Sequence, residues 1–363
     1  MPRTGSTSLQ VILTHLRPLL LEHGVLYPEI KPRSFPWASP NHQPFGETLD
    51  GRRPAHEKAE CLASLSQALE RTQADTVILS YEDFAHQHPR FGVPGILRAA
   101  LAQHGFAMEV AVVVKAPSEQ LNSVYSHRAQ MIRETRTFGE FARQAWRSGR
   151  FDYQALTEPW IAAANGRISA IPLRDRRSDA PLIERFVAAL GLQERIGELI
   201  GGAERGLVEN RSPGPIAVEA SRRLRRMRVH RQAKAHPREI GRFIDEQAWA
   251  RGWDATPFRG NDPAMLTRID AHFGAANDRF AQQVWGDRWA AVARDAGARE
   301  PTELAGRPIP PETEERIAWL VAQTMTHHGF HRPPDLWCRT LNLVEAGATQ
   351  LAPRLGYRGW RVR

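Results

Sequence analysis

The sequence predicts an α/β protein in which helices cover both faces of a parallel sheet. Short apolar runs rich in β-branched residues alternate with segments in which apolar residues recur at helical spacing. The clearest run is Val110–Val114, and further strands are expected at residues 25–27, 76–83 and 168–173. This alternation is typical of parallel sheets, whose ligands bind beyond the carboxyl ends of the strands.

Helices are expected between and after these strands, because apolar residues there share one face of a 3.6-residue repeat. The first helix follows the opening residues and ends near Gly24. Residues 31–56 are proline-rich and predict a loop, which we interpret as a candidate acceptor-binding lid around Trp37, His42 and Phe45. The other expected helices cover residues 57–71, 93–104, 118–132, 138–147, 153–164, 182–190, 215–250, 262–295 and 312–352.

Composition limits the class of protein. The 363 residues allow one large domain with an appendage, or two domains. The formal net charge of +9 is carried almost wholly by arginine and suits an anionic ligand, an acidic glycan or a nucleic acid. Cys61 and Cys338 are the only cysteines, which excludes a disulfide framework and fits a cytoplasmic protein. No apolar run approaches the ~20 residues that a membrane-spanning helix needs.

The opening stretch Pro2–Gln10 places one cation, one glycine and four hydroxyls at the start of the first helix. Unpaired backbone N–H groups and the positive end of the helix dipole favour an anion at such a place. An ordinary Ser/Thr-capped helix start is the alternative interpretation, since the lysine and second glycine of a Walker loop are missing. The candidate anion-binding residues are Arg3, Thr4, Gly5, Ser6, Thr7 and Ser8.

The pattern P-[KR]-[ST]-G-[ST]-[ST] in Pro2–Thr7 resembles the 5′-phosphosulfate loop of sulfotransferases that use 3′-phosphoadenosine 5′-phosphosulfate (PAPS). In that family a basic residue at a strand end and a serine about eight residues later hold the 3′-phosphate. Lys115 and Ser123 match this pattern, although the family usually has arginine where this chain has Lys115. Lysine keeps the charge and loses the bidentate fork of arginine.

The resemblance covers about residues 1–290 and extends to Ile78–Glu82, to the stretch from Phe151 to Trp160 and to Phe186–Leu192. It implies a P-loop NTPase-like three-layer fold with a central parallel sheet, followed by a helical extension over residues 291–363. It also implies transfer of the sulfuryl group of PAPS to a hydroxyl acceptor, with carbohydrates or glycans as the expected acceptors. The product nucleotide would be 3′-phosphoadenosine 5′-phosphate (PAP), and no metal is expected.

The family places a general base at the end of the strand that Ile78–Glu82 occupies, so the resemblance implies Glu82 as the base and Arg3 as the residue that stabilises the leaving oxygen. His127, His42 and His56 are the alternative bases. A phosphate-binding loop of this family normally follows a buried strand, yet the loop begins here at residue 2. We therefore expect a short Val/Ile-rich strand about ten residues upstream in the natural protein.

Two other classes of protein remain open. A P-loop-type nucleotide-dependent kinase is the first, although a Walker lysine and a clear magnesium-binding aspartate after a strand are missing from the sequence. The second is a degenerate sulfotransferase fold that binds without catalysis. The arginine-rich stretch Arg222–Arg231 contains no aromatic residue, so we expect no nucleic-acid partner and interpret it as a solvated helix face or an acidic-glycan groove.

Overall fold

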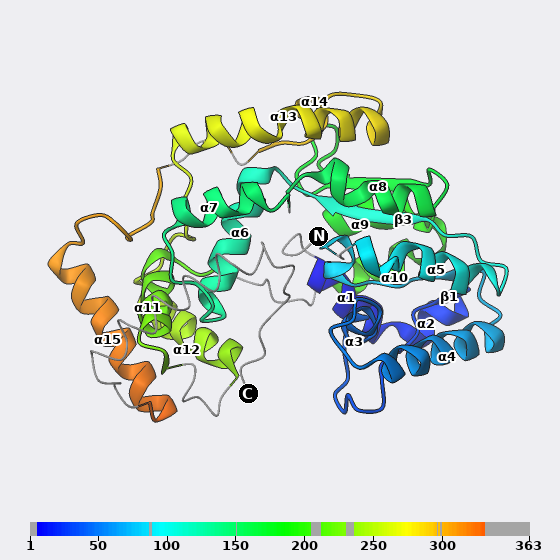
Figure 1. Cartoon of the computed structure of the whole chain (residues 1–363), viewed down its shortest axis with the longest axis horizontal. Helices are drawn as coiled ribbons and strands as arrows, with labels where there is room; N and C mark the ends of the chain where they lie inside the picture. Colours follow the sequence, from blue (N-terminus) through cyan, green and yellow to red (C-terminus); the bar gives the residue numbers. More distant parts are fainter. Residues whose placement is uncertain are drawn as a thin grey trace. The chain divides into compact units, whose positions relative to one another are not determined.

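A computed structural model gives an α/β architecture that is mainly helical and contains two small parallel sheets. It describes residues 6–86, 89–149, 151–204, 212–229, 236–295, 297 and 300–330 (Figure 1). Within these residues, none of the helices combines the length and the apolar character that crossing a membrane requires. The expected α/β class is confirmed at this level, and the P-loop-like three-layer fold stays a prediction.

Both sheets contain two parallel strands. Strand β1 (Val25–Leu26) pairs with β2 (Thr76–Val77), and β3 (Val110–Val114) pairs with β4 (Ile168–Pro172). The prediction of β3 is confirmed to the residue, because five consecutive Val and Ala residues suit a strand buried on both faces. The prediction of a strand over 76–83 was too long, since only Thr76 and Val77 pair with β1 and a 3₁₀ helix begins at Glu82.

The chain divides into two compact units built from discontinuous segments. Unit 1 comprises residues 1–120, 150–210 and 269–296, and unit 2 comprises residues 121–149, 211–268 and 297–363. The division at residue 290 that the family resemblance implies stays a prediction. Two helices, α6 (Pro117–Gln130) and α13 (Pro263–Trp285), contribute residues to both units.

Unit 1 holds both sheets, and most of its helices were expected from the sequence. A turn at Leu16, with Pro18 in the first turn of the next helix, divides the expected first helix into two. The helices that lie wholly in unit 1 are α1 (Ser6–His15), α2 (Arg17–Glu22), α3 (Gln43–Leu49), α4 (Ala55–Arg71), η1 (Glu82–His86), η2 (Pro89–Phe91), α5 (Val93–Ala102), α8 (Tyr153–Ala163), α9 (Leu182–Ala189), α10 (Gln193–Glu204) and α14 (Trp289–Val292).

Helix α3 corrects the expectation that residues 31–56 form only a loop. The prolines of this stretch favoured a loop, yet Pro44 lies in the first turn of α3, where a missing N–H costs nothing. Phe45 and Leu49 are buried and pack with Leu65 of α4 in one apolar cluster. Burial of one face therefore stabilises this short helix inside a proline-rich stretch.

The strand residues of β1 and β2 alternate between two apolar clusters. Val25 and Ile78 pack with residues of α1, α9 and α10. Leu26, Val77 and Leu79 pack instead with residues of α3, α4 and α5. This period of two places buried helices on both faces of the strands, as expected for a parallel arrangement.

Unit 2 is helical in its described residues. Its helices are α7 (Phe138–Arg147), α11 (Pro215–Arg226), α12 (Pro237–Ala250) and α15 (Pro311–His328). Helix α11 packs against α12 and α15, with Leu224, Ile240 and Leu320 buried between them (Figure 1). Of the expected final helix over 312–352, the part after residue 330 lies outside the described residues.

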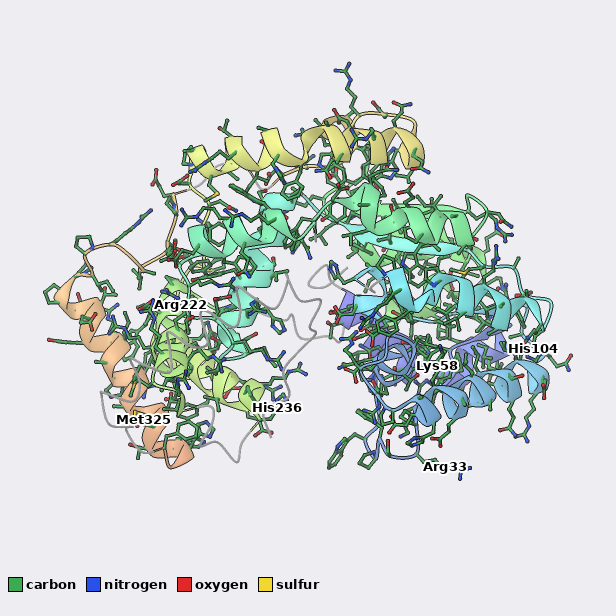
Figure 2. The ribbon with its side chains drawn as sticks, viewed as in Figure 1. Arg33, Lys58, His104, Arg222, His236 and Met325 are labelled. Atoms are coloured by element: carbon green, nitrogen blue, oxygen red, sulfur yellow. The ribbon has the colours of Figure 1, made fainter. Side chains whose placement is uncertain are left out.

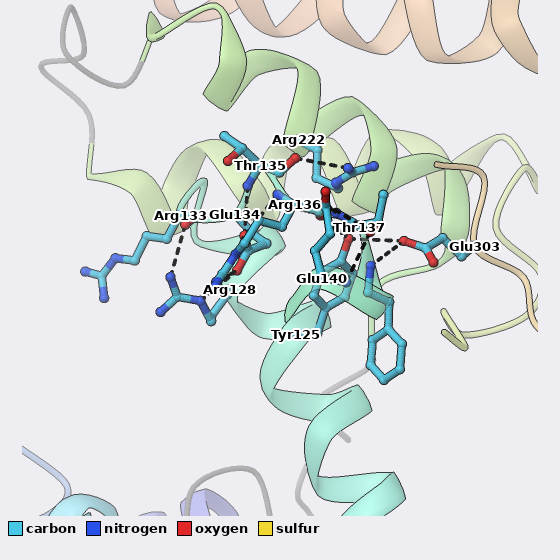
Figure 3. A network of polar contacts seen from close by, with 11 residues as sticks. Tyr125, Arg128, Arg133, Glu134, Thr135, Arg136, Thr137, Glu140, Arg222 and Glu303 are labelled. Carbon is cyan, nitrogen blue, oxygen red and sulfur yellow. Dashed lines mark hydrogen bonds and ion pairs between the residues drawn. The ribbon is translucent and has the colours of Figure 1, made fainter. Parts of the chain in front are cut away.

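The interpretation of the arginines of α11 as a solvated face was wrong for most of them, because Arg222 is buried and Arg223 and Arg225 are half-buried, while Arg226 is exposed. The Arg222 side chain is 1% exposed and donates a hydrogen bond to the Glu219 carboxylate. It also donates one to the Thr135 carbonyl, as Figure 3 shows. Arg223 pairs with Glu219 and with Glu314 of α15. Glu219 lies one helical turn before both arginines, and this acidic partner turns them inward. Arg231 lies outside the described residues.

Candidate functional site

The start of α1 lies beside the carboxyl end of β2. The Thr7 hydroxyl donates a hydrogen bond to Glu82 Oε1 at 3.2 Å. One turn further along α1, Gln10 Nε2 donates to Ser80 Oγ at 3.0 Å. These contacts join residues more than 65 positions apart and bring the predicted anion-binding stretch to the predicted base.

The first turn of α1 supplies the groups that an anion needs. Its leading backbone N–H groups have no partner within the helix, and the dipole is positive at that end. Thr7 and Ser8 are both half-buried in this turn, and Ser6 is the first residue of the helix. The predicted site residues Arg3, Thr4 and Gly5 lie outside the described residues.

Two neighbouring carboxylates in η1 have different surroundings. Glu82 accepts the hydrogen bond from Thr7 and lines a cavity of about 690 Å³ in unit 1. Asp83 accepts hydrogen bonds from Arg52 Nη1 at 3.1 Å and from the Tyr81 hydroxyl at 3.2 Å. Tyr81 packs so closely on α3 that a Cβ at Gly46 would lie 2.3 Å from its ring. Asp83 is thus part of the scaffold, and Glu82 is the carboxylate that faces α1.

His42 has a structural position that the sequence did not reveal. Its side chain is 1% exposed, its Nδ1 accepts the Ser80 N–H at 3.0 Å, and its Nε2 donates to the Pro28 carbonyl at 2.8 Å. Burial lowers the pKa of His42 to about 4, against the opposing effect of the two backbone hydrogen bonds. With both ring nitrogens engaged by the main chain, His42 holds the end of β2 in place rather than acting as a base.

Lys115 directly follows the carboxyl end of β3 and is 5% exposed. Its carbonyl accepts the Tyr153 hydroxyl at 2.6 Å, and the Tyr153 ring stacks on Trp289. Ser123 lies half-buried in the second turn of α6, as expected from its spacing. Lys115 belongs to unit 1 and Ser123 to unit 2, so joint binding of one phosphate by this pair stays a prediction.

The remaining alternative bases lie elsewhere. His56 is exposed in the first turn of α4, and His127 Nδ1 lies 3.4 Å from Gln130 Oε1 in unit 2.

Sequence reasoning missed the roles of Gln10 and Asn41, whose side chains hydrogen-bond each other at 3.1 Å and join α1 to the lid candidate. These contacts form only when the chain folds, and no local sequence pattern predicts them. Trp37 of that segment is 71% exposed, and its role in acceptor binding stays a prediction.

Among the described residues, no group of three or more His, Cys, Asp and Glu side chains is arranged to hold a metal ion. Comparison of the chain with protein-family models, with curated proteins and with solved structures finds no significant match. The residues of this site and the motif resemblance described above are therefore the basis for proposing a function.

Proposed function

We propose that this chain is a PAPS-dependent sulfotransferase that transfers a sulfuryl group to a hydroxyl acceptor, with carbohydrates or glycans as the acceptor class. The observation that supports this proposal best is the hydrogen bond between Thr7 and Glu82. It links a helix start suited to an anion with a carboxylate suited to a base, at the carboxyl end of a parallel strand.

In the proposed reaction the acceptor oxygen forms a bond to the sulfur of PAPS. The bond between that sulfur and the oxygen of the 5′-phosphate breaks, and PAP leaves with the electron pair. The acceptor proton passes to the Glu82 carboxylate. Arg3 and the N–H groups of the first turn of α1 stabilise the charge on the leaving oxygen, and losing one such donor typically costs about 10²–10³ in rate.

Lys115 and Ser123 hold the 3′-phosphate in this proposal. Burial of Lys115 supports the assignment, since a lysine kept at a strand end interacts more strongly with an anion than one in bulk water. The positioning of two reactants by fixed groups supplies most of the catalysis in related phosphoryl transfers, and no metal is needed for such positioning here.

The two carboxylates of η1 provide a matched test. Transfer from radiolabelled PAPS to a panel of hydroxyl acceptors is measured for the unmodified protein, Glu82→Gln and Asp83→Asn. We expect Glu82→Gln to lower turnover by about 10²–10⁴ while leaving PAP affinity unchanged, because only the proton acceptor is removed. Asp83→Asn retains turnover if it folds. Equal turnover in Glu82→Gln and the unmodified protein would exclude Glu82 as the base.

Transfer of phosphate from ATP to the same acceptors would instead favour the kinase. PAP binding without transfer to any acceptor would favour the degenerate binding protein. These outcomes separate the three classes in one set of assays.

A further inference from the structure

A chain of hydrogen bonds leads from the main chain of α3 to the cavity wall beside Glu82. The Gln43 N–H donates to Asn41 Oδ1 at 3.0 Å, and Asn41 Nδ2 donates to Gln10 Oε1 at 3.1 Å. Gln10 Nε2 in turn donates to Ser80 Oγ at 3.0 Å. Gln10 is 1% exposed, so its amide is held by these partners rather than by solvent.

The main chain fixes the direction of these hydrogen bonds. A backbone N–H can only donate, so the atom of Asn41 that faces Gln43 is the amide oxygen, and the Ser39 hydroxyl donates to the same atom. The NH₂ group of Asn41 therefore faces Gln10 and meets its amide oxygen, which leaves the NH₂ group of Gln10 facing Ser80. Reversal of either amide would place two donors opposite each other.

The Ser80 hydroxyl is thus an acceptor towards Gln10 and has its hydrogen left to donate. A hydroxyl carries one hydrogen and two lone pairs, and Gln10 occupies only a lone pair. Within the described part of the chain, no group accepts a hydrogen bond from Ser80 Oγ. Ser80 is half-buried and lines the 690 Å³ cavity together with Gln10 and Glu82. An oxygen of a ligand in this cavity is therefore a suitable partner for the hydroxyl hydrogen.

Helix α1 brings this hydroxyl and the Glu82 carboxylate to one place. Thr7 and Gln10 lie one helical turn apart on the same face of α1, and they contact Glu82 and Ser80 respectively. A ligand group that enters beside them meets a carboxylate that accepts and a hydroxyl that donates. The hydroxyl of a substrate satisfies both, because it has a hydrogen for the carboxylate and lone pairs for Ser80.

We propose that Ser80 binds the attacking oxygen of the acceptor, that Gln10 and Asn41 are positioning residues that keep Ser80 a donor, and that this arrangement selects oxygen over nitrogen nucleophiles. The inference rests on the proposed function and adds the class of acceptor atom.

The electron pairs of the acceptor explain the selection. The acceptor oxygen forms the bond to sulfur with one lone pair, keeps the Ser80 hydrogen bond with the other, and gives its proton to Glu82. The bond from sulfur to the 5′-phosphate oxygen breaks, and PAP leaves with that electron pair. A neutral amine has a single lone pair, so it loses the Ser80 hydrogen bond when it attacks. A site built to hydrogen-bond a substrate hydroxyl discriminates against groups that cannot make the same contact.

Two substitutions test the donor role. Ser80→Ala removes the hydroxyl. Gln10→Glu keeps the shape of the side chain but offers Ser80 an acceptor, which turns the hydroxyl hydrogen away from the cavity. Gln67→Glu adds the same charge at an exposed position of α4 and is the matched control. Thermal unfolding and calorimetric titration with PAP are measured for each variant, and we expect PAP affinity to stay unchanged. If Gln10→Glu does not fold, Ser80→Ala and the conservative Ser80→Thr decide the test.

Transfer from radiolabelled PAPS is measured with chitosan tetrasaccharide, a probe that carries both hydroxyls and amines. A mildly alkaline pH keeps the new carboxyl ionised and the amines neutral. We expect the unmodified protein and Gln67→Glu to form mainly O-sulfate. In Ser80→Ala and Gln10→Glu we expect O-sulfation to slow about tenfold, as for the loss of one hydrogen bond, without an equal loss of N-sulfation. Ser80→Thr keeps the hydroxyl and is expected to recover most of the O-sulfation rate.

The possible outcomes separate this inference from the proposed function. Equal O-sulfation rates and equal ratios of O- to N-sulfate in the unmodified protein, Ser80→Ala and Gln10→Glu would overturn the role of Ser80 and leave the sulfotransferase activity standing. Predominant N-sulfation by the unmodified protein would overturn the selection of oxygen. If the unmodified protein transferred sulfuryl to neither the tetrasaccharide nor water, the proposed reaction would be contradicted, and this inference with it.

Discussion

The two units use charged residues in opposite ways. In unit 2, the buried Arg222 of α11 (labelled in Figure 2) donates hydrogen bonds to the Glu219 carboxylate and to the Thr135 carbonyl. In the same unit, Arg136 donates a hydrogen bond to the Glu134 carboxylate (Figure 3). In unit 1, ionisable residues lie at strand ends beside a helix start, with Glu82 on the cavity wall and Lys115 after β3. The richest arginine cluster is thus a structural network, and the sparser set of charges is the candidate site.

This difference shows that the density of basic residues does not locate an anion site. Arg33, at the periphery of unit 1, is 97% exposed, whereas the Arg222 side chain is 1% exposed (Figure 2). The charge of a buried arginine is balanced by its carboxylate partners within the fold, so it does not attract an external anion. A site is better recognised from the position of residues at strand and helix ends than from net charge.

The largest effect is expected at Glu134, which is 1% exposed and accepts hydrogen bonds from Arg128 and Arg136. Burial is the largest single influence and raises the pKa of Glu134, but the hydrogen bonds from Arg136 and the charges of Arg128 and Arg136 together outweigh it and lower the pKa to about 2. Glu134→Gln removes the charge that these arginines share, so we expect the free energy of unfolding to fall by about 3–5 kcal/mol. Glu140→Gln preserves a capping box and is the near-neutral control. Denaturant unfolding measures both, and equal stability of the two variants would contradict the network.

The next effect concerns pH and His42. Its pKa is about 4 in the folded protein and near 6.5 when unfolded, so between these values the unfolded chain binds more protons. The stabilisation is complete above pH 6.5 and is lost as pH falls towards 4, by on the order of 3 kcal/mol in the free energy of unfolding. We expect His42→Gln to reduce this pH dependence, and the exposed-site control His56→Gln to retain it. An identical pH profile in His42→Gln would remove His42 from this role.

A smaller effect is expected at Lys115. Lys115→Met removes the cation at the end of β3, and we expect PAP to bind about 10–100-fold more weakly, as for the loss of one charged hydrogen bond. Lys115→Arg supplies the arginine that sulfotransferases usually have at this place, and we expect it to retain or improve affinity. Calorimetric titration with PAP checks both variants. Unchanged affinity in Lys115→Met would separate Lys115 from the 3′-phosphate.

The smallest effect is expected at Thr7. Thr7→Val keeps the shape of the side chain and removes its hydrogen bond to Glu82, which is 3.2 Å long and only partly buried, so we expect it to contribute no more than about 0.5–1.5 kcal/mol. We expect turnover to fall by roughly three- to tenfold, and Thr7→Ser to restore most of it. Full activity in Thr7→Val would show that this contact does not organise the base.

Local patterns predicted much of the fold. The limits of β3 follow from a run of β-branched residues, and those of α7 follow from apolar residues at helical spacing. Both patterns involve only residues that are close together in the sequence. The short pairing of β2 depends on which residues of β1 lie opposite, and that information is spread along the chain. Helix α3 was missed because its stability comes from burial against α4.

The candidate site was predictable only in part. The family resemblance implied Thr7 and Glu82 as site residues, and the structure joins their side chains by a hydrogen bond. The engagement of His42 with Ser80 and Pro28 was not predictable, because it joins residues that are distant in sequence. Likewise, the inward orientation of Arg223 requires Glu314, which lies 91 residues away and gives no local signal.

Calorimetric titration with PAP, with ADP as the control ligand, tests the proposed donor site most directly. It is performed on the 363-residue chain. The proposed function predicts micromolar PAP binding and no binding of ADP. Preference for ADP, or binding of neither nucleotide, would contradict it.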